Sequence, residues 1–101
     1  MNSLEVFKQV VKLAKQVSTI ATLSPDVESR LMMEFAELYE RYLNSIPPEH
    51  RDLIMVVMPN PNADFEYMEV RISEIPERLR RGDRELFRKL VKLFSELPEE
   101  L

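Results

Sequence analysis

Apolar residues recur every three or four positions over residues 3–20 and again over residues 25–46. This period predicts two amphipathic helices near the start of the chain. Asn2 and Ser24 stand just before them as capping residues, and Pro47 ends the second helix. The apolar positions of the first helix cover more than a single stripe, so we expect this helix to contact two partners.

The spacing changes to period two within residues 51–72, which predicts a β-hairpin. Its first strand, Leu53 to Met58, is apolar on both faces. We predict a register with the cross-strand pairs Met58–Phe65, Val56–Tyr67 and Ile54–Glu69. One face then carries Ile54, Val56, Met58, Phe65, Tyr67, Glu69 and Arg71. A slip by one residue would regroup the first strand, but in either register the hairpin has two apolar faces and needs two covers.

A short helix over residues 73–81 and a last helix after Asp83 complete the predicted chain. Gly82, the only glycine, fits a helix C-cap that requires positive φ. The last helix is expected to bury Leu86, Phe87, Leu90, Val91, Phe94 and Leu97. The element order is therefore α-α-β-β-α. It indicates a single small α+β domain over residues 1–101, with the helices on one face of a small antiparallel sheet.

The composition narrows the classes of protein to consider. The absence of cysteine excludes disulfides and thiolate metal sites, which leaves self-association open as a source of stability for so short a chain. A single glycine and 32% charged residues suggest adaptation to heat. No apolar run is long enough to span a bilayer, and the N-terminus lacks the layout of a signal peptide. We therefore expect a cytoplasmic protein with no membrane partner.

Candidate catalytic groups are few. The single histidine, His50, is expected to be solvated or to cap a helix. The glycine count excludes a glycine-rich phosphate loop, and the serines lack a nucleophile-elbow motif. The acids of the second helix are expected to form a solvated face, with a paired-carboxylate site as the alternative: Glu28, Glu34, Glu37 and Glu40. We predict no enzyme activity, no cofactor and no metal.

Charge is distributed unevenly along the chain, although the net charge is only −4. Residues 78–92 carry a local excess of basic residues, and four of them recur at helical spacing: Arg81, Arg84, Arg88 and Lys92. This pattern favours either a track for a nucleic-acid backbone or ion pairs with the acidic middle of the chain. A second, smaller basic stripe lies on the first helix and consists of Lys8, Lys12 and Lys15.

The stretches "IMVVM", "FEYMEVRI" and "RLRRGDRELFRK" bring apolar strands, aromatic residues and flanking arginines together behind two helices. This layout, over roughly residues 25–94, resembles the DNA-binding domain of ThermoDBP and its shorter related proteins. Those are single-stranded DNA-binding proteins of hyperthermophilic archaea. The resemblance implies a non-enzymatic oligomer that binds single strands in an apolar cleft rimmed by arginines. The chain departs from the family in its net acidity and leaves no room for a C-terminal zipper.

Two functional hypotheses follow. Strand aromatics usually pack in a core or a subunit interface, but exposed on a sheet they stack on unpaired bases. The main hypothesis is sequence-tolerant binding of single-stranded nucleic acid by a homodimer or homotetramer. Phe65 and Tyr67 would stack on bases, and five arginines would contact phosphates: Arg71, Arg80, Arg81, Arg84 and Arg88. The alternative is a protein-interaction module that uses the exposed apolar sheet face.

Overall fold

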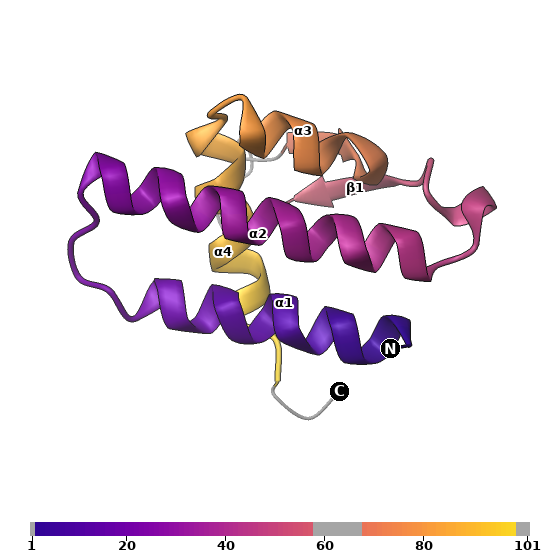
Figure 1. Cartoon of the computed structure of the whole chain (residues 1–101), viewed down its shortest axis with the longest axis horizontal. Helices are drawn as coiled ribbons and strands as arrows, with labels where there is room; N and C mark the ends of the chain where they lie inside the picture. The colour runs from indigo at the N-terminus through magenta and orange to yellow at the C-terminus, as the bar shows by residue number, and fades with distance from the viewer. Residues whose placement is uncertain (1, 58–67, 99–101) are drawn as a thin grey trace.

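Two antiparallel helices, α1 (Ser3–Ser18) and α2 (Pro25–Ser45), dominate the computed structural model, which describes residues 2–57 and 68–98 (Figure 1). α3 lies along α2 on the side opposite α1, and α4 crosses behind α1 and α2 (Figure 1). This arrangement confirms the predicted α+β class. The remaining elements are the 3-10 turn Pro48–His50, β1 (Ile54–Val57), β2 (Met68–Arg71), the 3-10 turn Ile72–Glu74, α3 (Ile75–Arg80) and α4 (Arg84–Ser95).

α1 begins where the sequence predicts, because the Asn2 side chain accepts a hydrogen bond from the Glu5 backbone N–H at 2.9 Å. The helix contacts two partners, also as predicted. The Phe7 ring lies 5.3 Å from that of Tyr42 in α2 and 5.6 Å from that of Phe94 in α4. The wide apolar face of α1 is therefore largely covered within the monomer, and it gives no reason for self-association.

The core is centred on aromatic residues of α2 and α4. Phe35 is fully buried, and its ring centroid lies 5.9 Å from that of Phe87 and 6.0 Å from that of Phe94. Tyr39 stacks beside both Phe35 and Phe94. Burial raises the pKa of the Tyr39 phenol, because the ionised form would lose its contact with water. These rings join helices that are far apart in the sequence.

The two strands are antiparallel, but their register is shifted by two residues from the prediction. Ile54 lies opposite Arg71 and Val56 lies opposite Glu69, so the predicted Ile54–Glu69 and Val56–Tyr67 pairs are wrong. The strand pattern fixes only which residues alternate, and a shift of two preserves that alternation. The predicted grouping of side chains by face is therefore right for the described residues. The pair Met58–Phe65 lies outside them.

The connection between α3 and α4 is a capped turn at Gly82, whose φ is +90°. The Gly82 N–H donates to the Leu79 carbonyl at 3.0 Å, and the Asp83 N–H donates to the Arg78 carbonyl at 3.1 Å. These two bonds form a Schellman motif. The Asp83 side chain then accepts a hydrogen bond from the Leu86 N–H at 3.1 Å and caps α4. Both predicted caps are confirmed.

Candidate interaction surfaces

The helices cover one face of the hairpin and leave the other exposed. On the inner face, Val57 and Val70 are buried in the core. On the opposite face, Ile54 and Val56 keep 59% and 51% of their surface exposed. We call the outward-facing side chains of the described strand residues the outer sheet face, and this set consists of Ile54, Val56, Glu69 and Arg71. Of the two covers that the sequence requires, residues 2–57 and 68–98 therefore provide one.

Among the residues predicted to bind nucleic acid, Arg71 lies on the outer sheet face. Its Nη1 donates to the Asp52 carbonyl at 3.2 Å. The carboxylates of Asp52 and Glu74 lie 4.0 and 3.8 Å from its guanidinium, which is long for an ion pair. Phe65 and Tyr67 lie outside the described residues, so their stacking role stays a prediction.

The arginines around the α3–α4 turn each contact a carboxylate of the same chain. Arg80 pairs with Glu40 and thereby connects α3 to α2. Arg81 pairs with Glu77, one helical turn earlier, at 2.8 Å. Arg80 and Arg81 thus contact different carboxylates. The ion-pair interpretation of the basic segment accounts for these contacts without any external anion.

Arg84 and Arg88 converge on Glu28 in the first turn of α2. Arg88 donates through Nε and Nη2 to the two carboxylate oxygens at 3.0 and 3.1 Å, and Arg84 donates to the same carboxylate. Glu28 is only 5% exposed, so its predicted place on a solvated face is wrong. The sequence does contain a signal for this burial. Glu28 precedes the buried Met32 and Phe35 by four and seven positions, so the three residues share one helix face.

The electrostatics of this cluster favour a charged Glu28. The hydrogen bond from Arg88 lowers the pKa of Glu28, burial opposes this by disfavouring the ionised form, and the bond from Arg84 lowers the pKa further. Together these effects place the pKa of Glu28 below its usual value of 4.5. The same contact raises the pKa of Arg88. The cluster joins the start of α2 to α4, so its first role is structural.

The lysine stripe of α1 differs from the arginines. Lys8 and Lys12 are exposed and have no carboxylate partner among residues 2–57 and 68–98. Lys15 donates from Nζ to the Ser95 carbonyl at 3.0 Å, at the C-terminal end of α4. A helix C-terminus carries partial negative charge, so this contact is favourable. In the described part of the chain, the stripe therefore retains positive charge that no carboxylate neutralises.

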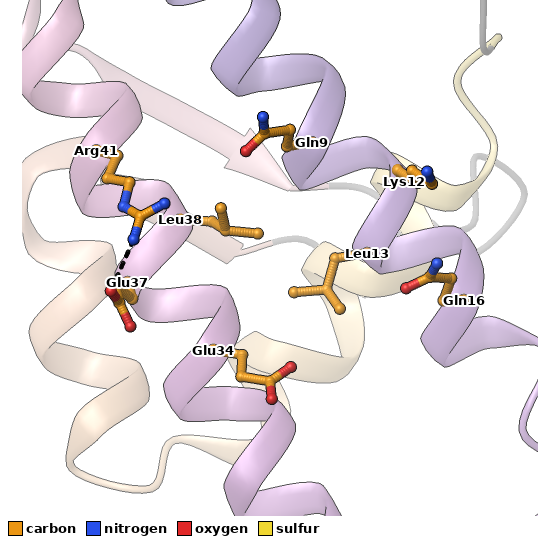
Figure 2. Close-up of a pocket in the computed structure, with 8 residues that line it drawn as sticks. All are labelled: Gln9, Lys12, Leu13, Gln16, Glu34, Glu37, Leu38 and Arg41. Atoms are coloured by element: carbon orange, nitrogen blue, oxygen red, sulfur yellow. Dashed lines mark hydrogen bonds and ion pairs between the residues drawn. The ribbon is translucent and has the colours of Figure 1, made fainter. Parts of the chain in front are cut away.

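An open groove of about 310 Å³ lies between α1 and α2 (Figure 2). Leu13 and Leu38 point toward one another across it (Figure 2). Its rim has both signs of charge, because Lys12 comes from α1 whereas Glu37 and Arg41 of α2 pair with each other at 3.0 Å. Such a rim selects neither an anion nor a cation, and we assign the groove no ligand.

Other classes of site find little support in the described residues. His50 is exposed in its 3-10 turn. Among the described residues, no group of histidine and acidic side chains could hold a metal ion. Within the same residues, no helix combines the length and the apolar character needed to cross a bilayer.

The chain matches no known family model, no curated protein and no solved structure.

Proposed function

We propose that this protein is a non-enzymatic interaction module that binds another protein chain through its outer sheet face. The observation that carries the proposal is the exposure of Ile54 and Val56, which are 59% and 51% exposed within a strand. Residues of this kind usually occupy the covered side of a sheet. A partner chain that covers them would supply the second cover of the hairpin.

The position of these residues, more than their number, supports an interface. The chain also exposes Leu4, Ile20 and Met33, but these are scattered over α1, α2 and the loop that joins them. Single exposed hydrophobic residues are ordinary, whereas a contiguous apolar patch marks an interaction site. Ile54 and Val56 share one face of β1 and form such a patch, whereas Leu53, which is 57% exposed, directly precedes β1 and belongs to the opposite face by alternation.

We expect Ile54→Glu to remove the protein from its complex without unfolding it. The new carboxylate would lie opposite Arg71, and opposite charges in a cross-strand pair are favourable. The measurement is size-exclusion chromatography of soluble cell extract with detection of this chain. Wild type should elute well ahead of the 12.0 kDa monomer, and the variant should shift toward the monomer position.

Met33→Glu is the matched control, because Met33 is 50% exposed but lies on α2. It should elute with the wild type. Elution of wild type as a monomer, both in extract and after purification, would disprove the proposal. Equal shifts for the two variants would show that added charge, and not this surface, decides assembly.

Single-stranded nucleic-acid binding is a second candidate, and the lysine stripe favours it. Lys8 and Lys12 have no carboxylate partner in the described residues, so they are free to release counterions from a phosphate backbone. Arg80, Arg81, Arg84 and Arg88 would have to leave their carboxylates to do the same. Within this hypothesis we therefore expect the lysines to dominate the salt-dependent part of binding.

Fluorescence anisotropy with a labelled single-stranded oligonucleotide tests this candidate over a range of salt concentrations. The double variant Lys8→Ala/Lys12→Ala should reduce the slope of log K against log salt by about 1.4, that is about 0.7 for each phosphate that a lysine no longer neutralises. Arg81→Ala, which removes a cation already paired with Glu77, should leave the slope unchanged. A wild type that shows no salt-sensitive binding would exclude nucleic-acid binding.

A further inference from the structure

The outer sheet face carries one acid, one base and two aliphatic residues in a two-by-two array. Ile54 lies beside Arg71, and Val56 lies beside Glu69. Among the described residues, Glu69 has no ion-pair partner, and Arg71, besides its hydrogen bond to the Asp52 carbonyl, has only long contacts to the carboxylates of Asp52 and Glu74. Glu69 and Arg71 are two residues apart along β2, which separates them by about 7 Å. The array is therefore charged at two neighbouring corners, with opposite signs.

In a two-fold symmetric dimer a surface contacts its own copy, so the three principal axes through the centre of this array can be compared. An axis parallel to the strands would stack Arg71 on the partner's Ile54, which buries a charge without a counter-charge. An axis normal to the sheet would join two strand edges and leave the aliphatic side chains exposed. An axis in the plane of the sheet and across the strands stacks Glu69 on the partner's Arg71, and Ile54 on the partner's Val56.

We propose that the partner at the outer sheet face is a second copy of this chain, packed face to face about the axis that runs across the strands. This inference rests on the proposed function and names its partner. The symmetry forms the Glu69–Arg71 contact twice and the Ile54–Val56 contact twice. Aligned sheets pack about 10 Å apart, a distance that these side chains span from both sides. The paired charges lie along one side of the aliphatic contact and fix its orientation.

Two charge reversals test this arrangement in the purified full chain. Glu69→Arg gives a face with two bases, and Arg71→Glu gives a face with two acids. Each variant alone repels its own copy, so we expect its dimer dissociation constant, measured by sedimentation equilibrium, to rise about tenfold or more. The double variant Glu69→Arg/Arg71→Glu restores opposite charges at both contacts, and its constant should return to within about threefold of wild type.

Mixing the two single variants gives a result that misfolding cannot imitate. The two-base face of Glu69→Arg is complementary to the two-acid face of Arg71→Glu, so an equimolar mixture should form a heterodimer although neither variant forms a homodimer. Arg81→Ala is the control for a general charge effect, since Arg81 pairs with Glu77 in its own chain. It should dimerise like wild type.

Three results would overturn the inference. They are a purified wild type that stays monomeric at millimolar concentration, single reversals that leave the dissociation constant unchanged, and a mixture that fails to associate. These failures are distinguishable from a failure of the proposed function. If Ile54→Glu still abolishes a complex in cell extract while purified wild type is monomeric, the interaction module stands and its partner is a different protein.

Discussion

Phe35→Ala is expected to lower the free energy of unfolding by about 3–5 kcal/mol. Phe35 is fully buried, and its ring packs against the rings of Tyr39, Phe87 and Phe94. Its removal leaves a cavity where α2 and α4 meet, and each of the three neighbouring rings is left without a packing partner on that side. A small domain has a total stability of about 5–15 kcal/mol, so this decrease is a large share of it.

Urea denaturation followed by circular dichroism measures this decrease. Phe7→Ala is a useful comparison, because Phe7 is only partly buried, although it packs against the rings of Tyr42 and Phe94. We expect a clearly smaller decrease there, since the site is closer to solvent and leaves less of an enclosed cavity. A decrease below about 1 kcal/mol for Phe35→Ala would contradict the aromatic core described above.

Glu28→Gln is expected to lower the free energy of unfolding at neutral pH by roughly 1–3 kcal/mol. The carboxamide has an NH2 donor in place of one acceptor oxygen, so at least one of the three hydrogen bonds from Arg84 and Arg88 is lost and the others lose their charge assistance. The decrease stays moderate because both arginines remain partly in contact with water. The carboxamide also remains in place as a polar group, so the site is weakened without leaving a cavity.

The same substitution should change the response of stability to acid. The pKa of Glu28 is lowered in the folded protein, so its contribution is fully present above the unfolded value near 4.5 and is lost as pH falls through the folded value. Wild type should therefore lose more stability than Glu28→Gln between pH 6 and pH 3. Glu34→Gln is the control, since Glu34 is exposed in α2. Parallel acid profiles for wild type and Glu28→Gln would contradict the assignment.

Local signals predicted the helices well because capping is a short-range effect. Asn2, Ser24 and Asp83 each accept a backbone N–H three residues later, as the sequence indicates. Gly82 adopts the positive φ that its isolation between two helical patterns predicts. In each case the partners lie within a few residues, so the sequence contains the whole interaction.

Longer-range features were less predictable from the sequence. The predicted hairpin register differs from the observed one by two residues, because alternation determines which face a side chain is on but not its cross-strand partner. The partner of Glu28 lies 60 positions away in Arg88, and no local pattern connects them. The arginines were a similar case. Their spacing predicts a shared face, but it does not reveal that carboxylates such as Glu40 and Glu77 contact Arg80 and Arg81.

The position of α4 has a consequence for the synthesis of this protein. α1 and α2 emerge from the ribosome before α4, but the rings of Phe87 and Phe94 that pack on Phe35 belong to α4. Until that helix is released, the apolar side of the first two helices stays open to water and to other nascent chains. Folding of the core is therefore completed only once α4 is available, and until then the helical pair exposes apolar surface that is prone to aggregation.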